Sequence, residues 1–460
     1  MNNKENILGS ESVSKLLIKY SVPAIIGMMV NALYNVVDRM FIGNIPGVGP
    51  MAITGLGVTM PIMSVILAFG TLIGVGATTN VSIKLGQGQR DKAEKIVGNA
   101  ISLSVIIGLV MIIFGSLYLD KILSIFGASE ATLGYAKSYM SIILLGSVFS
   151  LMSMMFGNLI RGDGNPKLSA AIMATGCGMN IVLDALFIFG FGMGIQGAAL
   201  ATIISQGVAT VWGLAYYLRG KSNVKLKKEN LKLDVEIIKT IFAIGMAPFA
   251  MQLANSVVIL MFNTTLKKYG GDLAIGAMAT VSSINMMFVM PAFGFVQGMQ
   301  PIVGYNYGAK KYDRAKEALK ISLISATVVF LIGALVIQIA PQLVVGAFNR
   351  DPELMSITIS GLRKYALAMP IIGISIVGSN FIQSIGKAKM SMLLGLLRQV
   401  IVLIPMIFIL PNFFGLDGAW YAQPTADIVS VIITGIVLAK EVKRYTIVEE
   451  EEDELIEEAS

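Results

Sequence analysis

Several long stretches of this sequence contain no Asp, Glu, Lys or Arg residue. Each is longer than the ~20 residues that a helix needs to cross the hydrocarbon core of a bilayer. They include Met40–Ile83, Ile96–Leu119, Ser138–Ile160, Ala185–Leu218, Thr240–Leu266, Leu273–Ala309 and Ile321–Asn349. Because a chain in lipid must satisfy its own backbone hydrogen bonds, and because the alternating pattern of a membrane barrel is absent, we expect helices. Only 14% of the residues are charged, against about 25% in soluble domains, so the sequence predicts an all-α integral membrane protein.

Twelve transmembrane helices are expected along the chain. The expected spans are residues 16–42, 51–83, 96–119, 135–160, 168–190, 197–219, 237–266, 274–305, 318–345, 357–384, 391–411 and 418–440. Basic residues gather in alternate connections, namely 84–95, 161–167, 219–239, 310–320 and 387–389. Since such connections stay in the cytoplasm, we expect both termini to be cytoplasmic, in a bacterial or archaeal cell membrane. The net charge of +7 reflects this bias of the loops and does not indicate nucleic-acid binding.

The two halves of the chain repeat. Pro23 in LIKYSVPA matches Pro248 in IFAIGMAP, and LDALFIFGFGMGIQGAA (183–199) matches IPMIFILPNFFGLDGAW (404–420). Six spans per half return the second copy in the same membrane orientation, so we expect two pseudo-symmetric six-helix bundles related by an axis along the membrane normal. The expected parts are an N-terminal lobe at 1–219, a cytoplasmic linker at 220–236, a C-terminal lobe at 237–445 and a disordered acidic tail at 446–460.

The residue types that most enzymes and metal clusters need are scarce. The sequence has no histidine and a single cysteine, Cys177. Histidine-based triads, histidine metal sites and a disulfide framework are therefore excluded. Because no nucleophile–base constellation is present either, we expect neither an enzyme nor a cofactor.

Two aspartates lie inside expected spans of the first half. Asp38 falls near one helical face with Asn31 and Tyr34, and Asp184 follows Asn180 by one turn. An acid at such depth costs ~2.5–3.5 kcal/mol on insertion scales and usually faces protein or a water-filled cavity. Counted from the cytoplasmic starts of their spans, the two acids lie at similar depth. They are candidates to hold a proton, or to bind Na⁺ with neighbouring oxygens. The structural alternatives are that Asp38 sits at the headgroup level and only pairs with Arg39, or that both acids cap or bridge helices without moving a cation.

The second half carries Asp427 on the twelfth expected span and Arg398 on the eleventh. A buried ion pair and a functional role both stay open for these two residues. Spans 7 and 8 are polar on one side and rich in methionine, which suits a surface that repacks around varied ligands. The expected substrate-binding residues are Gln252, Asn255, Asn285, Met287 and Met290.

Several segments resemble the multidrug and toxic compound extrusion (MATE) family, and its DinF- and MepA-like branch in particular. They are SVPAIIGMMVNALYNVVDRMFIG in the first span, the loop IRGDGNPK, MNIVLDALFIFGFGMGIQGAALATIISQ (179–206) and PIVGYNYGA. The resemblance covers roughly residues 16–440. It implies a monomeric, V-shaped pair of bundles that exports organic cations or amphipathic drugs by alternating access, in exchange for H⁺ or Na⁺.

The same resemblance implies a cation site within the first bundle. The matching positions are Tyr34, Asp38, Asn180, Asp184 and Thr202, of which the last four would hold Na⁺ if that is the coupling ion. The chain departs from the NorM-like pattern, because PFAMQLANSVV after Pro248 contains no carboxylate. The alternative is a flippase for a lipid-linked saccharide. A polyanionic headgroup calls for a basic cavity, whereas the basic residues here lie mostly in loops, so an exporter is preferred.

Overall fold

The structure is a computed structural model that describes residues 7–43, 45, 49–126, 128, 130–220, 222–346, 348 and 352–459. Within these ranges the regular structure is entirely helical, which confirms the expected fold class. Nine of the described helices are long and apolar enough to cross a membrane, and two bent helix pairs raise the number to eleven. A further helix, α17, covers the twelfth expected span.

The first repeat and the linker contain eleven helical elements among the described residues. They are α1 (Ile7–Ser10), α2 (Val13–Gly43), α3 (Gly49–Gly86), α4 (Arg90–Leu117), α5 (Leu119–Ile125), α6 (Glu130–Leu145), α7 (Ser147–Gly162), α8 (Pro166–Ala185), the π-helix η1 (Leu186–Gly190), α9 (Gly194–Leu218) and the 3-10 helix η2 (Lys228–Leu231).

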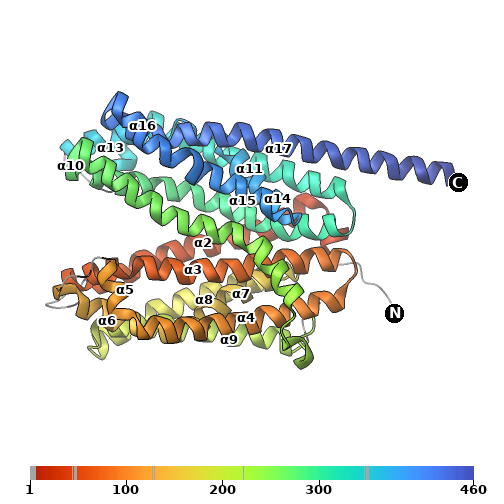
Figure 1. Cartoon of the computed structure of the whole chain (residues 1–460), viewed down its shortest axis with the longest axis horizontal. Coiled ribbons are helices and arrows are strands. Elements are labelled where there is room, and N and C mark those ends of the chain that lie inside the picture. Colours follow the sequence, from red (N-terminus) through yellow and green to blue (C-terminus); the bar gives the residue numbers. More distant parts are fainter. Residues whose placement is uncertain are drawn as a thin grey trace. The chain divides into compact units, whose positions relative to one another are not determined.

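The second repeat contains ten helical elements among the described residues (Figure 1). They are α10 (Val235–Gly308), α11 (Tyr312–Ile339), α12 (Pro341–Gly346), α13 (Pro352–Tyr365), the 3-10 helix η3 (Met369–Ile371), α14 (Ile372–Ser384), α15 (Ala388–Leu396), the π-helix η4 (Leu397–Leu403), α16 (Ile404–Phe414) and α17 (Leu416–Ala459). The long α10 holds both the seventh and the eighth expected spans. They meet at Gly271, whose φ of 67° only glycine adopts without strain.

The fourth span of each repeat is broken at a corresponding place. The pair formed by residues 132–145 of α6 and by α7 is bent by 56°, and the pair formed by α13 and by residues 369–384 is bent by 42°. The duplication that the sequence indicates therefore extends to a local irregularity of the backbone, which no hydrophobic pattern predicts.

The chain forms two compact units: unit 1 is Met1–Ile25 with Leu253–Ser460, and unit 2 is Ile26–Gln252. Their boundaries fall inside α2 and α10, whereas the expected lobes divided at the linker 220–236. Backbone packing explains the difference. In unit 2 an added Cβ at Gly245 would lie 2.0 Å from the Leu72 carbonyl oxygen, and one at Gly76 would lie 2.2 Å from that of Ile241. The start of α10 therefore packs directly on α3.

The start of α2 packs in the corresponding way inside unit 1. An added Cβ at Gly294 would lie 2.2 Å from the Ile25 side chain, and one at Gly298 would lie 2.8 Å from the Ser21 backbone nitrogen. Small residues at such crossings let helix backbones approach closely. Each repeat thus places the start of its first helix on the second span of the other repeat.

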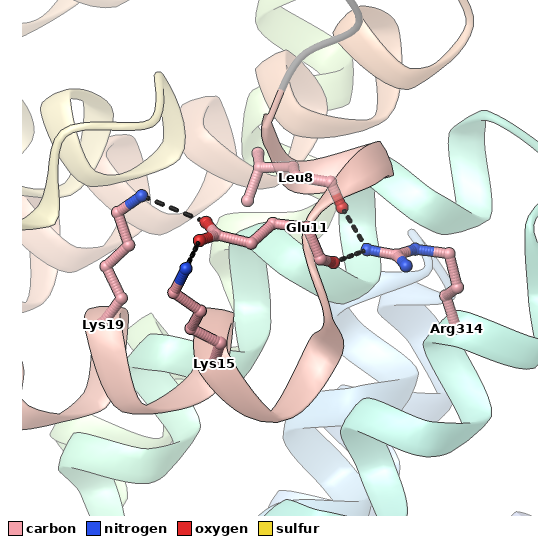
Figure 2. Close-up of polar contacts among 5 residues, drawn as sticks. All are labelled: Leu8, Glu11, Lys15, Lys19 and Arg314. Carbon is pink, nitrogen blue, oxygen red and sulfur yellow. Dashed lines mark hydrogen bonds and ion pairs between the residues drawn. The ribbon is translucent and has the colours of Figure 1, made fainter.

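The residues around α1 form a cap on unit 1, which we call the N-terminal cap (residues 7–11). Leu8 is fully buried, and its carbonyl oxygen accepts hydrogen bonds from Asn306 Nδ2 at 3.0 Å and from Arg314 Nη2 at 3.2 Å. The same guanidinium bonds the Glu11 carbonyl oxygen (Figure 2). The Glu11 carboxylate turns the other way, toward Lys15 at 2.9 Å and Lys19 at 3.2 Å.

The linker forms the corresponding cap on unit 2, which we call the linker cap (residues 222–234). Asn99 of α4 holds it on both sides: Nδ2 donates to the Lys232 carbonyl at 3.2 Å, and Oδ1 accepts from the Asp234 N–H at 2.7 Å. Asp163, in the loop before α8, accepts hydrogen bonds from Tyr216 Oη at 2.6 Å and from the Asn223 N–H at 3.0 Å. Burial raises the pKa of the Asp163 carboxyl to about 7, although these two donors lower it in part.

The acidic end of the chain differs from the expected disordered tail at 446–460. Helix α17 continues to Ala459 (Figure 1). Glutamate has a high helix propensity, so a helix that already leaves the membrane can extend through a glutamate-rich segment.

Candidate cation site

Three of the expected site residues meet at the packed ends of α8 and α9 in unit 2. Asn180, Asp184 and Thr202 are all 5% exposed or less. In one orientation the Asn180 amide donates to Thr202 Oγ1 at 3.4 Å. In the other it donates to Asp184 Oδ2 at 3.0 Å and accepts from the Thr202 N–H at 3.1 Å. The second orientation satisfies both neighbours with shorter bonds, so it describes the site better.

Asp38 comes to the same place from α2. It is 7% exposed, and its carboxyl group lies within hydrogen-bonding reach of the Asp184 carboxyl. The second oxygen of Asp184, Oδ1, is buried and receives no hydrogen bond from any described residue. Two carboxylates are both acceptors, so a hydrogen bond between them requires a proton, and a cation between them would serve the same purpose.

Two tyrosines complete the site. The side chains of Tyr34 on α2 and Tyr139 on α6 lie near Thr202, and both tyrosines lie in the electrostatic field of the two aspartates. Tyr139 is 2% exposed and was not among the expected site residues. Its only signal in the sequence is a phenol in an apolar span, a feature that many membrane helices share.

The backbone around Asp184 departs from regular α-helix. The π-helix η1 begins two residues after Asp184 and is followed by Gly197 at the start of α9, where an added Cβ would lie 2.9 Å from the Phe187 backbone. Buried alanines at 198, 199 and 201 continue the close contact face of α9. Insertions of this π type are frequent at functional sites because they redirect side chains.

The composition of the site suits one small cation. The described residues contain no group of three or more Asp, Glu, Cys or His side chains that could hold a metal ion. The two carboxylates, the Asn180 amide and the Thr202 hydroxyl are all oxygen donors once the amide is turned toward an ion. Hard oxygen ligands with limited negative charge fit a monovalent ion or a proton better than a transition metal.

The second half holds its aspartate in a different way. Arg398 Nε on η4 donates to Asp427 Oδ1 on α17 at 2.8 Å, and Gln423 Nε2 donates to the same oxygen at 2.9 Å. Tyr365 Oη on α13 donates to Gln423 Oε1 at 3.4 Å. Of the two interpretations left open by the sequence, the structure therefore shows the buried ion pair. The aspartate side chain is 5% exposed and the arginine side chain 18%.

The expected substrate residues lie in both compact units. Gln252 is the last residue of unit 2, whereas the other four belong to unit 1. On α10, Met287 is 61% exposed and Asn255 is exposed, while Asn285 and Met290 are half-buried. Their role in substrate binding stays a prediction.

Comparison with known proteins agrees with this architecture. The chain is 27% identical over 436 residues to the multidrug export protein MepA of Staphylococcus haemolyticus, and the match covers 95% of both chains. It is 26% identical over 415 residues to the MepA protein of Staphylococcus aureus, with 90% of this chain and 91% of that one covered.

Solved structures share the fold. One is an outward-facing multidrug resistance MATE family transporter of the MOP superfamily, with a TM-score of 0.89 at 23% identity over 97% of this chain and 99% of that one. A MOP superfamily transporter from Pyrococcus furiosus also gives a TM-score of 0.89, at 24% identity and the same coverage. The MatE family model matches residues 23–186 and 248–409, one segment in each repeat. These two segments make up well over half of the sequence, and the chain belongs to the MatE family, as the resemblance of its first span and its repeat predicted.

Proposed function

We propose that this chain is a secondary-active exporter of cationic or amphipathic compounds that exchanges its substrate for H⁺ or Na⁺ by alternating access. It works as a monomer in a bacterial or archaeal cytoplasmic membrane, with both termini inside. The observation that carries the proposal is the pair formed by Asp38 and Asp184, two buried carboxyl groups that face each other in unit 2. The similarity to multidrug export proteins supports the substrate class.

The pair can couple transport because its requirement for a cation depends on burial. A driving ion shifts a conformational equilibrium only if it binds one state more tightly than the other. When the two carboxyl groups are enclosed, they repel each other unless a proton or Na⁺ lies between them; when water reaches them, the cation can leave. One charge that moves through 100 mV supplies ~2.3 kcal/mol, enough to bias each cycle.

Substrate binding is assigned to the polar and methionine-rich faces of α10, through Gln252, Asn255, Asn285, Met287 and Met290. Transport of a polyanionic lipid-linked saccharide is the weaker alternative, because the guanidinium of Arg398 is already neutralised by Asp427. Met287→Arg and Gln252→Lys test the assigned substrate path: both variants should impair export of cations. Normal rates in both would remove these faces from the substrate path.

The coupling proposal is tested by Asp38→Asn and Asp184→Asn. Asparagine keeps the shape but takes up no charge, so gradient-driven uptake of a fluorescent cation into inverted vesicles should be lost at matched expression. Imposing pH and Na⁺ gradients separately identifies the ion. The matched control is Asp120→Asn, which removes an exposed aspartate paired with Lys137 at 2.8 Å and should transport normally. Wild-type rates in both site variants would move the coupling site elsewhere.

The topology is tested by single cysteines at two exposed lysines, Lys228 on η2 and Lys268 on α10. The native Cys177 is buried and serves as the unlabelled background. Lys228→Cys should react with a membrane-impermeant reagent only from the cytoplasmic side, and Lys268→Cys only from outside. Labelling of both from one side contradicts the proposed orientation.

A further inference from the structure

We propose that Arg398 is a tethered counter-cation: its guanidinium occupies the position that a free H⁺ or Na⁺ would take beside Asp427, so that only unit 2 exchanges a coupling ion. This inference rests on the proposed function and extends it to the number of ion sites. Arg398, Gln423, Tyr365 and Asp427 form a group that we call the Asp427 cluster. Three of its features support the inference: its position in the repeat, its composition and its charge balance.

The Asp427 cluster and the cation site of unit 2 both take residues from the fourth, fifth and sixth spans of their repeats, whereas only the cation site also takes residues, Asp38 and Tyr34, from the first span. Gln423 follows Thr202 by 221 residues, the same spacing that relates Pro405 to Asp184. Each cluster also receives a tyrosine from the first helix of the bent pair: Tyr139 from α6 and Tyr365 from α13. Each has a π-helix on the fifth span of its repeat, η1 in one and η4 in the other.

The two clusters differ in what faces the carboxyl group. In unit 2, Asp184 faces a second carboxyl, that of Asp38. In unit 1 the position that corresponds to Asp184 is occupied by Pro405. The aspartate of this cluster, Asp427, lies on α17 and accepts a hydrogen bond from Arg398 on η4 at 2.8 Å. The second repeat therefore also has a buried acid, a tyrosine and a hydrogen-bonding side chain from the last span, but its acid is paired with a cation of the protein itself.

A guanidinium fixed to the backbone cannot dissociate into water. A buried carboxylate needs a nearby positive charge, and Arg398 meets that need in every conformation in which the pair persists. Because its charge is already balanced, the Asp427 carboxylate does not need to bind and release a free cation during the transport cycle. The pair therefore keeps Asp427 neutralised within the protein, and coupling ions are exchanged only at the site in unit 2.

Few other charged groups face Asp427. Among the described residues, the charged and titratable partners around it are Arg398 from η4 and Tyr365 from α13. Of the other elements that contact α17, α14, α16 and η3 carry no charged residue, α15 carries only the exposed Lys389, and the charged residues of α11 lie in its first nine residues. On α13, Lys364 is engaged by Asp417, and Arg363 Nη2 donates to the Gln338 carbonyl at 3.1 Å. If the Arg398 guanidinium is removed, we therefore expect no other positively charged side chain to replace it beside the Asp427 carboxylate.

The test removes the tether and asks whether a free cation replaces it. All variants are made in an Asp38→Asn, Asp184→Asn background, so the result does not depend on whether unit 2 couples transport. Trp212→Phe leaves Trp420 as the only tryptophan. This residue is 1% exposed on α17 and precedes Gln423 by one turn, so its emission reports unfolding of this unit.

The measured quantity is the thermal midpoint of the purified full chain in detergent, with NaCl replacing choline chloride at constant ionic strength, and separately on acidification. Arg398→Gln should have a lowered midpoint without Na⁺ at alkaline pH. It should recover by several degrees on addition of Na⁺ or acid, because a ligand that binds only the folded state stabilises it. Arg398→Lys, which keeps the tether, and Arg398→Gln with Asp427→Asn, which removes the acid, should respond no more than the background.

Recovery with acid alone identifies a proton as the replacement, and recovery with NaCl at constant pH identifies Na⁺; either result supports the proposal. The proposal is overturned if the thermal midpoint of Arg398→Gln responds to neither cation more than that of Arg398→Gln with Asp427→Asn. Failure of Arg398→Gln to fold in acid and in Na⁺, while the double variant folds, also overturns it, since no free cation then replaces the guanidinium.

Discussion

The two units of this protein differ in the groups that contact their buried aspartates. In unit 2 the donors to Asp184 and Asp163 are neutral: the Asn180 amide for the first, and a tyrosine hydroxyl with a backbone N–H for the second. In unit 1 Asp427 is paired with Arg398. The two repeats thus share their arrangement of helices but differ in the charge next to the buried acid. The difference shows that two repeats with the same helices can surround a buried acid with neutral donors in one case and with an arginine in the other.

The largest contrast concerns folding stability. Asp427→Asn leaves the Arg398 guanidinium without its carboxylate, and loss of one partner from a buried pair costs about 3–5 kcal/mol. Asp184→Asn removes mutual repulsion between two acids and should be neutral or stabilising. Chemical unfolding of the two purified variants beside wild type measures both effects. An Asp184→Asn protein less stable than Asp427→Asn would reverse the comparison.

The pH dependence of stability sharpens the comparison at the linker cap. The pKa of Asp163 is raised to about 7 in the folded protein, so the folded state holds this proton at pH values where the unfolded chain has lost it. Its contribution to stability therefore falls as pH rises from about 4 to about 7, by at most about 4 kcal/mol, and is constant above.

Asp163→Asn removes this titration. The stability of the variant relative to wild type should increase across the same pH interval and then level off, as followed by thermal unfolding. Lys137→Gln, which leaves the exposed partner Asp120 in place, is the control and should leave the wild-type pH profile unchanged. A difference between Asp163→Asn and wild type that does not depend on pH would mean that Asp163 stays ionised throughout.

The smallest contrast separates the two tyrosines. Tyr139→Phe and Tyr365→Phe each remove a single hydroxyl, with an expected cost of about 0.5–1.5 kcal/mol in the free energy of unfolding. Only Tyr139→Phe should also change the dependence of transport on the ion gradient, because we propose ion exchange for its cluster alone. Equal shifts of that dependence in both variants would place both clusters in the coupling mechanism.

Much of the fold could be predicted because its physical signals are local. Apolar runs without charge mark the spans, as the helices at 49–86 and 312–339 confirm. The family follows from the residues around Pro23, Asp38 and Asp184. Burial of the two acids was foreseeable as well, because an acid inside a span costs enough free energy that it must have a partner.

The remaining features depend on contacts between distant parts of the chain. Tyr139 reaches the cation site only because α6 packs beside α9. The sequence around a tyrosine in an apolar span does not show which residues its hydroxyl group will approach. The unit boundaries inside α2 and α10 follow from glycines such as Gly245 and Gly298, whose partners lie more than 170 residues away in sequence. The neutralisation of Asp427 stayed open for a similar reason, since spacing alone does not show whether two side chains meet.

The starts of α2 and α10 each pack on the second span of the other repeat, and this arrangement determines the order in which the two units can assemble. Unit 2 is continuous, residues 26–252, and all of its parts exist once Gln252 has left the ribosome. Unit 1 is discontinuous: its N-terminal segment is made first, and Ser21 and Ile25 in that segment can pack on Gly298 and Gly294 only after these glycines have been made. Domains fold as units during synthesis, so the earliest segment to be made is among the last to be placed. Neither repeat is therefore a complete folding unit when it is expressed without the other.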